Sequence, residues 1–242
     1  MKTLTCVVPA RNEAGYLEQL ISSILSVADI NEVIIVEGGS SDSTYEIAKR
    51  IADTSPNRVK CIRQSGRGKF NAVLEGFNEA NSDFLMIWDA DGTVPVESTK
   101  KIISLALEQN CFSMGDRLRG ERESGAMQFA NFVGNWIFAS IWAPLNRIRP
   151  TDIFCGTKVF PSGILINIPN RVIVGDPYGD ISLLLAARLT GTKIRAVPVR
   201  YSTRVYGESK MRRWKMGYVF MKLSLLSYKE VLITQRRKRP FS

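Results

Sequence analysis

The chain of 242 residues contains no histidine. This absence excludes a Ser-His-Asp triad, a Cys-His nucleophile pair and any imidazole metal ligand, so acid–base chemistry must come from Asp, Glu, Lys, Tyr or the substrate. A metal site in this chain would be built mostly from oxygen ligands, which favours Mg²⁺ or Mn²⁺.

Cysteine is scarce as well, and no two cysteines form a Cys-x-x-Cys pair. Three of the four lie in strand-like apolar segments, so we expect buried free thiols in a reducing compartment rather than disulfides or a zinc site. The four are Cys6, Cys61, Cys111 and Cys155.

No apolar run reaches the roughly 18 residues that a transmembrane helix needs. The nearest candidate, residues 124–146, has no charge but contains Gln128, Asn131 and Pro144. We expect a buried or membrane-surface helix there, and not a span. The first residues lead directly into a strand pattern, so we expect no signal peptide.

Negative charge is in deficit. Lys and Arg number 33 against 23 Asp and Glu, which gives a formal net charge of +10. Such a surface favours polyanions: nucleic acid, anionic lipid headgroups or phosphorylated substrates.

Strand and helix patterns alternate through the first half of the chain. Apolar strand patterns occupy 4–8, 33–36, 59–62, 84–88 and 112–114, and helical spacing of apolar residues recurs at 17–24, 45–51, 69–79 and 100–107. Repeated strand–helix units predict an α/β fold with a mostly parallel sheet and helices on both faces.

The fourth of these strands, Phe84 to Trp88, leads directly into Asp89 and Asp91. Residues two apart on an extended chain point the same way, so both carboxylates could face one hard cation. The alternative is an acidic turn at a strand end, with Gly92 making the bend. The Asp-x-Asp spacing alone does not decide between these interpretations.

All four of the first strands end in polar, mostly glycine-rich loops, at residues 9–13, 37–44, 64–69 and 89–92. Ligands of open α/β sheets collect at the carboxyl ends of strands, so these loops would line one continuous cleft. The fingerprint G-x-G-x-x-G is absent from the first loop, and no G-x-x-x-x-G-K-[ST] occurs. These absences argue against a dinucleotide dehydrogenase and a P-loop NTPase.

The segments VVPARNE, VEGGSSDST, GRGKFNA and WDADG, in this order, resemble the motifs of family 2 glycosyltransferases with the GT-A fold. Later segments at 115–117, 151–158, 179–183 and 201–210 resemble the polyprenyl-phosphate branch, the dolichyl-phosphate mannose and glucose synthase-like enzymes. The resemblance implies a GT-A, Rossmann-like sheet flanked by helices. It also implies inverting transfer of a single sugar from a UDP- or GDP-sugar to a polyprenyl or dolichyl phosphate.

The resemblance also implies roles for individual residues. Asp89 and Asp91 would bind Mg²⁺ or Mn²⁺, and Asp180, with Asp91, would be catalytic. Other residues would bind the nucleotide-sugar: Pro9, Arg11, Asn12, Glu13, Glu37, Ser40, Asp42, Gly66, Lys69, Asp89 and Ala90. The acceptor phosphate would be held by Arg117, Arg119, Arg204 and Lys210. The family usually has two acidic residues where this chain has Glu37 and Gly38, which leaves the donor base and sugar open.

The last third adds an edge-strand pattern at 193–199 and a core-helix pattern at 181–189. Residues 211–233 mix aromatic and basic residues ahead of a polybasic tail. We expect a glycosyltransferase domain at 1–205 and a basic amphipathic helix with its tail at 206–242. Such a helix suits an anionic membrane surface, and docking on the sheet is an equal alternative. We therefore expect a cytoplasmic protein, peripheral at the cytoplasmic face of the membrane.

Three other functions remain open on the sequence. The acceptor could be soluble or protein-linked, the chain could be a basic nucleic-acid-binding module, or it could be a catalytically inactive relative. A nucleic-acid-binding module predicts steeply salt-dependent binding that survives loss of Asp89 and Asp91. No interleaved aromatic and basic stripe supports that function, so we expect no nucleic-acid partner.

Overall fold

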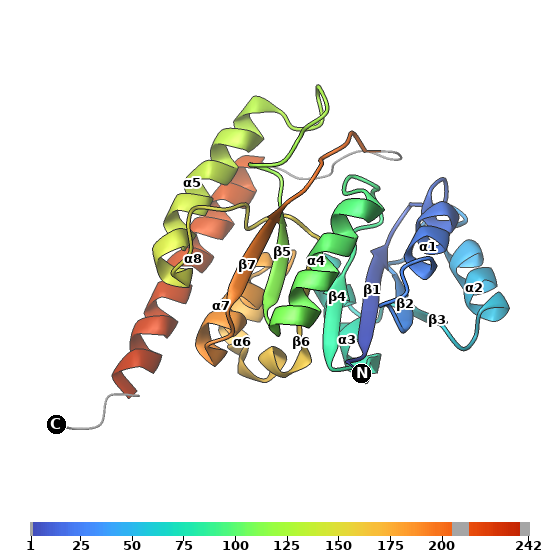
Figure 1. Ribbon diagram of the computed structural model, residues 1–242, viewed down its shortest axis with the longest axis horizontal. Helices are drawn as coiled ribbons and strands as arrows, with labels where there is room; N and C mark the ends of the chain where they lie inside the picture. The colour runs from blue at the N-terminus through green and yellow to red at the C-terminus, as the bar shows by residue number, and fades with distance from the viewer. Residues whose placement is uncertain (1, 205–212, 238–242) are drawn as a thin grey trace.

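A seven-stranded sheet forms the centre of the computed structural model, which describes residues 2–204 and 213–237 (Figure 1). The strand order is β3-β2-β1-β4-β6-β5-β7. Strands β1 to β4 run parallel to one another, β7 runs parallel to β5, and β6 runs antiparallel to β4 and β5. The strands are β1 (Leu4–Ala10), β2 (Glu32–Glu37), β3 (Val59–Arg63), β4 (Phe84–Ile87), β5 (Phe112–Asp116), β6 (Lys158–Pro161) and β7 (Ile194–Pro198).

Helices cover both faces of the sheet, because the central strands are apolar on both sides. On β1, Cys6 and Val8 face one hydrophobic cluster and Val7 faces the other. The first cluster includes residues of α1 (Leu17–Leu25), α2 (Thr44–Thr54) and α4 (Val96–Gln109). The second includes residues of α3 (Lys69–Glu79), α5 (Phe129–Asn146), α7 (Asp180–Thr190) and α8 (Arg213–Arg237).

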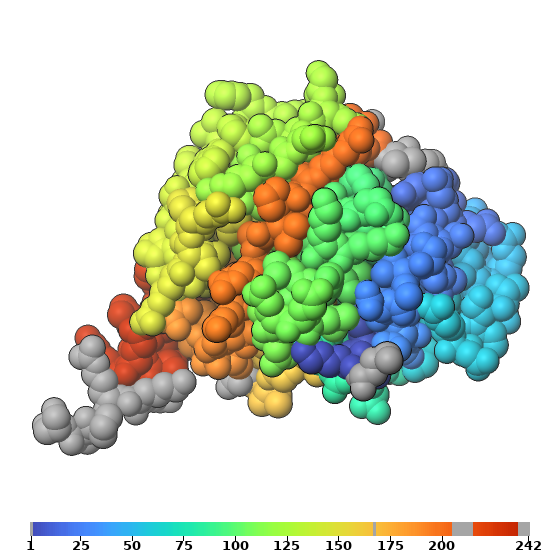
Figure 2. All heavy atoms as spheres, in the orientation of Figure 1, coloured from blue at the N-terminus to red at the C-terminus, as the bar shows by residue number. Residues whose placement is uncertain are grey.

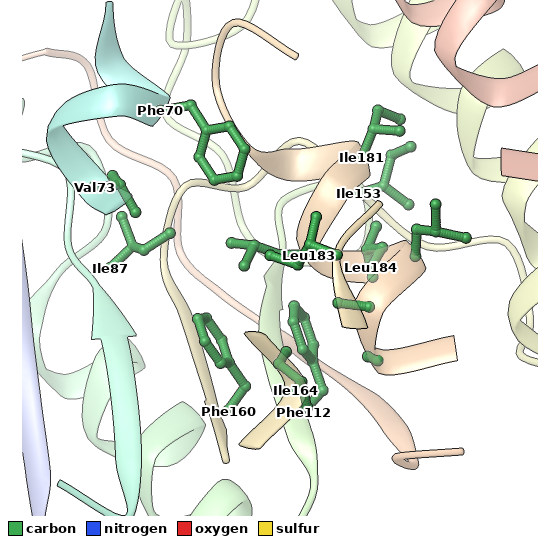
Figure 3. Packing of buried hydrophobic residues seen from close by; sticks show 14 of the residues in the cluster. Phe70, Val73, Ile87, Phe112, Ile153, Phe160, Ile164, Ile181, Leu183 and Leu184 are labelled. Atoms are coloured by element: carbon green, nitrogen blue, oxygen red, sulfur yellow. The ribbon is translucent and has the colours of Figure 1, made fainter. Parts of the chain in front are cut away.

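The second cluster joins the two halves of the chain. Figure 3 shows Phe70 and Val73 of α3 and Ile87 of β4 beside Leu183 of α7, with Phe160 of β6 close by. Phe160 stacks on Phe112 of β5 with a ring-centroid distance of 5.3 Å. Packing across this cluster fixes where α7 begins, and the first residue of α7 is Asp180.

Most of these elements agree with the patterns in the sequence, and three short ones do not. The α/β class, the mostly parallel sheet, the edge position of β7 and the buried helix α7 are confirmed. Strand β6, the 3₁₀ helix η1 (Ser162–Asn167) and α6 (Asn170–Ile173) were not predicted. Strand β6 has four residues and runs antiparallel to both β4 and β5, so no strand–helix alternation indicates it.

Helices α5 and α8 lie side by side at one flank of the molecule (Figure 1). The indole N–H of Trp142 on α5 donates to Ser224 Oγ on α8 over 2.9 Å. Phe220 of α8 packs on Phe154, with a ring-centroid distance of 4.5 Å, and on Phe138. Among the described residues, no helix is long and apolar enough to cross a membrane.

The proposed boundary between residues 205 and 206 stays a prediction, because 205–212 lie outside the described residues. All four cysteines are free, and three of them are buried. Both findings agree with the expectation of free thiols.

We predict that Phe220→Ala lowers the free energy of unfolding by about 3–5 kcal/mol, because it removes a buried ring and leaves a cavity between α5, α7 and α8. Urea unfolding measures the change. Tyr218→Ala is the matched control on the same helix, since 74% of Tyr218 is exposed, and it should have little effect. Equal losses in the two variants would show that α8 does not dock through Phe220.

Candidate functional site

The carboxyl ends of β1 to β4 lie side by side, and the strand order reverses between β1 and β4. Strand β1 pairs with β2 on one side and with β4 on the other, so the loops after β1 and β4 flank a topological switch point. Ligands of open α/β sheets bind at such points. The loops that follow β1 to β4 carry the residues that the sequence analysis assigned to nucleotide and metal.

The loops after β1 and β2 are tied together by side-chain hydrogen bonds. The backbone N–H of Asn12 donates to Ser40 Oγ over 3.0 Å, and the backbone N–H of Ser41 donates to the side-chain Oδ1 of Asn12 over 2.8 Å. The Ser40 amide donates to Glu37 Oε1, while Asp42 accepts from the amide of Ala14. These polar residues therefore hold the two loops together through hydrogen bonds within the protein, without a ligand.

The third loop, after β3, is held by α3. Gly66 donates its amide to Glu75, and a Cβ at Gly66 would lie 2.4 Å from the Asn71 amide oxygen. A side chain at Gly38 would instead press on Gln64 Oε1, 3.1 Å from the Cβ position. Gln64 also donates to Asn71 Oδ1. An acidic side chain at position 38, where the family usually has one, would therefore lie against a glutamine that is already hydrogen-bonded.

Asp89, directly after β4, forms an ion pair with Lys69 at the start of α3. About a quarter of each side chain remains exposed. The backbone of Gly156 passes on the other side of the carboxylate, where a Cβ would lie 1.9 Å from Asp89 Oδ2. Only glycine allows this approach, so Asp89 is fixed between an ammonium group and a bare stretch of backbone.

Charge keeps this pair ionised. Burial alone would raise the pKa of Asp89, but the positive charges of Lys69, Lys158 and Arg117 outweigh it and lower the pKa. Burial alone would lower the pKa of Lys69, whereas Asp89 and Asp180 raise it above its ordinary value. Both groups are therefore charged at neutral pH.

Asp91 binds a different set of donors. Its Oδ1 accepts from the backbone amide and the hydroxyl of Thr93, and its Oδ2 accepts from Arg204 over 3.1 Å. The second terminal nitrogen of Arg204 lies 3.4 Å from Glu13 Oε1, in the loop after β1. A single guanidinium thus bridges carboxylates from two strand ends.

Asp180 forms a buried ion pair with Lys158, the first residue of β6. The Nζ–Oδ1 distance is 2.5 Å, and 1% of the Lys158 side chain and 12% of the Asp180 side chain are exposed. Lys158 also donates to the carbonyl of Cys155. Gly179, with φ +86°, lies against Phe70 and starts the helix, and Asp176 accepts the amides of Gly179 and Ser182.

Arg117 and Arg119 are paired with buried aspartates. Arg117 donates through Nε over 2.5 Å and through a terminal nitrogen over 3.2 Å to the two oxygens of Asp152. Arg119 donates to Asp116 over 2.9 Å. Burial opposes the charge of Arg117, but Asp152 raises its pKa well above the ordinary value. The two arginines that were predicted to bind the acceptor phosphate are therefore held in fixed orientations by these aspartates.

The two carboxylates after β4 can hold a divalent cation with few further protein ligands. Both line a cavity of about 20 Å³, enough for one water-sized species. Among the described residues, no group of three or more acidic or cysteine side chains is arranged to hold a metal. Mg²⁺ and Mn²⁺ commonly take one or two carboxylates together with substrate phosphates, so this donor set fits a cation shared with a diphosphate.

The structure brings most of the predicted site residues to one edge of the sheet, and Lys210 falls outside the described residues. Four residues at the site had no predicted role: Asp116, Asp152, Gly156 and Lys158. They belong to the segments 115–117 and 151–158, which the motif comparison noted without a function. Asp116 and Arg119 are only three residues apart. Nothing local in the sequence shows the other contacts, of Asp152 with Arg117, of Lys158 with Asp180 and of Gly156 with Asp89.

Comparison with known proteins agrees with the motifs. The profile described as Glycosyl transferase family 2 matches residues 5–163. Glycosyltransferase AglJ of Haloferax volcanii is 27% identical over 205 residues, which cover 84% of this chain and 64% of that protein. Dolichol-phosphate mannosyltransferase of Pyrococcus furiosus is 26% identical over 220 residues, 86% of this chain and 59% of that protein. The chain thus spans 59% to 64% of the length of these two relatives.

A third relative is matched over nearly its whole length. The UDP-N-acetylglucosamine–dolichyl-phosphate N-acetylglucosaminyltransferase of Methanococcus voltae is 24% identical over 249 residues, 96% of this chain and 98% of that protein.

Among solved structures, glucosyl-3-phosphoglycerate synthase from Mycobacterium tuberculosis, in complex with Mn²⁺, UDP-glucose and phosphoglyceric acid, has a TM-score of 0.67. It is 17% identical and covers 93% of this chain and 79% of its own. At this identity the likeness concerns the fold. Since the family profile covers most of the chain, and the sheet and its loops match that fold, the chain belongs to glycosyl transferase family 2.

Proposed function

We propose that this chain transfers a single sugar from a UDP- or GDP-sugar to a polyprenyl or dolichyl phosphate, with inversion at the anomeric carbon. The observation that carries the proposal is the pair Asp89 and Asp91 at the switch point between β1 and β4, surrounded by cations. A site with this charge pattern suits a nucleoside diphosphate on one side and a second phosphate on the other. The names of the dolichyl-phosphate-using relatives support the acceptor class.

The donor would lie over the loops after β1 to β3. We assign the base and ribose to Pro9, Arg11, Asn12, Glu13, Glu37, Ser40 and Asp42, with Gly66, Lys69 and Ala90 closing the pocket toward the phosphates. Lys69 is already an ammonium donor at the edge of this region. It would bind the diphosphate as a point charge.

Asp89 and Asp91 would hold Mg²⁺ or Mn²⁺. When bound, the cation neutralises charge on the departing nucleoside diphosphate. Lys69 lies beside the same carboxylates and would add a positive charge that needs no reorganisation when the bond breaks.

The acceptor phosphate would lie on the other side, near Arg117, Arg119 and Arg204, with Lys210 as a further ligand in the undescribed segment. A phosphate monoester is already ionised at neutral pH and needs little help from a base. The buried pair with Lys158 fixes the Asp180 carboxylate. We therefore assign Asp180 to orienting the acceptor for attack opposite the leaving group, rather than to removing a proton.

Two exposed stripes suit peripheral contact with a membrane. On α5, Phe129, Val133 and Ile137 are exposed at intervals of four residues. On α8, the exposed apolar residues Tyr218, Met221, Leu225 and Leu232 share a face with exposed basic residues spaced by seven, Lys215, Lys222, Lys229 and Arg236. Apolar residues flanked by cations are the pattern of a helix that lies on anionic lipid.

We predict that one nucleoside diphosphate raises the melting temperature only together with Mn²⁺, because a ligand that binds the native state stabilises it by mass action. At about 100 times Kd the gain is about 2.7 kcal/mol. A thermal-shift panel of UDP, GDP, CDP and their sugars, each with Mn²⁺ or EDTA, measures the shift and identifies the donor for transfer assays with polyprenyl phosphate.

The shift should disappear in Asp91→Ala and persist in Asp53→Ala, an exposed carboxylate on α2 that pairs with Lys49. Absence of a shift with every nucleotide, or a shift that EDTA and Asp91→Ala leave intact, would reject the donor site.

We also predict that the protein floats with vesicles containing anionic lipid and not with neutral vesicles. Leu225→Glu on α8 should weaken binding about tenfold or more, since burying a leucine side chain contributes about 1.5–3 kcal/mol. Ile166→Glu is the control, because Ile166 is 88% exposed but lies in η1. If the wild-type protein ignores both kinds of vesicle, a soluble or protein-linked acceptor becomes the better assignment.

A further inference from the structure

We propose that Arg204 is a built-in counter-ion that occupies Asp91 in the ligand-free protein and gives up this place when a divalent cation binds. The displaced guanidinium is then available to the acceptor phosphate. Cation binding and acceptor binding are thereby coupled through one side chain. The inference rests on the proposed function in one respect, the assignment of Asp89 and Asp91 to the metal.

The chain delivers Arg204 to the carboxylates along a defined path. Residues 199–204, here called the strap, follow β7 and cross the carboxyl edge of the sheet. In Figure 2 the orange band between α5 and α4 is β7 and, at its upper end, the strap, which continues toward the amino-terminal loops. The strap is held by backbone hydrogen bonds from Tyr201 to Glu121 O and from Ser202 to Thr93 O, two residues after Asp91.

At the end of the strap, the guanidinium is positioned by two carboxylates from different strand ends. One terminal nitrogen donates to Asp91 Oδ2 over 3.1 Å, and the other lies 3.4 Å from Glu13 Oε1. The Arg204 side chain is 30% exposed, against 17% for Asp91 and 12% for Glu13. The carboxylates are thus the more buried partners, and the arginine approaches them from the solvent side.

A cation that binds Asp91 must compete with this contact. Asp91 Oδ1 already accepts two hydrogen bonds from Thr93, within its own loop, and Oδ2 accepts from Arg204. Thr93 is fixed by its loop, whereas Arg204 is a long side chain that reaches in from another element. Arg204 is therefore the group that leaves.

Charge supports the same exchange. Asp89 and Asp91 together carry two negative charges, and Lys69 and Arg204 supply two positive charges. A divalent cation would supply two positive charges from one point, so with Lys69 in place it neutralises both carboxylates without Arg204. When it binds, Arg204 loses its closer contact, with Asp91, and keeps only the longer contact with Glu13, while Lys69 keeps the nearby charge of Asp180. By linkage, whatever draws Arg204 away strengthens cation binding, and cation binding strengthens the anion site to the same degree.

The test is Mn²⁺ binding, followed by the loss of the free-ion electron paramagnetic resonance signal, without nucleotide and with UDP or GDP. The probes are the wild-type chain, Arg204→Gln and Asp91→Asn. A hydrogen bond to a charged group contributes about 1–2 kcal/mol at a partly exposed site, so Arg204→Gln should bind Mn²⁺ about fivefold to thirtyfold more tightly than wild type. Asp91→Asn should lose the site.

Arg200→Gln is the matched control. It removes the same charge from the same strap, but Arg200 pairs with Glu123 over 3.2 Å instead of Asp91. Its Mn²⁺ affinity should stay within about twofold of wild type, since exposed charges are well screened. In EDTA, Arg204→Gln should also melt at a lower temperature than wild type, and Mn²⁺ should close the difference.

The outcomes distinguish failure of the inference from failure of the metal assignment. Equal Mn²⁺ affinity in wild type and Arg204→Gln, with loss in Asp91→Asn, overturns the inference and leaves the metal site standing. An equal gain in Arg200→Gln also overturns it, because bulk charge would then explain the effect. No Mn²⁺ binding by Arg204→Gln while wild type binds overturns the inference alone, and no Mn²⁺ binding by either chain, with or without nucleotide, rejects the metal assignment and the inference with it.

Discussion

Neutralisation of partly buried carboxylates is the constraint on which this end of the molecule depends. Five aspartates lie at or just beyond the carboxyl edge of the sheet, and leaving such a charge unpaired away from water is strongly unfavourable. Each is matched by a cation, and four of the five cations lie 20 or more residues away in the sequence. The pairs are Asp89 with Lys69, Asp91 with Arg204, Asp116 with Arg119, Asp152 with Arg117 and Asp180 with Lys158.

Because these pairs join distant segments, they also define the geometry of the site. Lys158 brings the amino end of β6 to the start of α7, and Gly156 brings the preceding loop against Asp89. Strand β6 lies between β4 and β5 and runs against both, so its first residue reaches the same edge at which the parallel strands end. The antiparallel insertion is what allows residues near 156 and near 89 to meet.

The sequence predicts the local half of this arrangement. Strand ends, glycine-rich loops and the Asp89–Asp91 spacing are local patterns, and with the alternation of elements they give the fold class and most of the donor side. The partners of these residues are not local. Nothing in the spacing of Lys158 and Asp180, or of Arg117 and Asp152, indicates that they touch, since both contacts depend on the path of β6 and of the loop before it. The short β6 is hidden for the same reason.

The pairs differ in how readily they can be exchanged for a ligand. Lys158 is 1% exposed and also donates to a backbone carbonyl, so a ligand cannot easily take its place beside Asp180. Arg204, at 30% exposure, lies between Asp91 and solvent. A divalent cation can replace such an exposed partner, because it neutralises the same carboxylate when the arginine moves out into solvent. The buried pairs therefore hold the site in shape, and the exposed pairs are where ligands enter it.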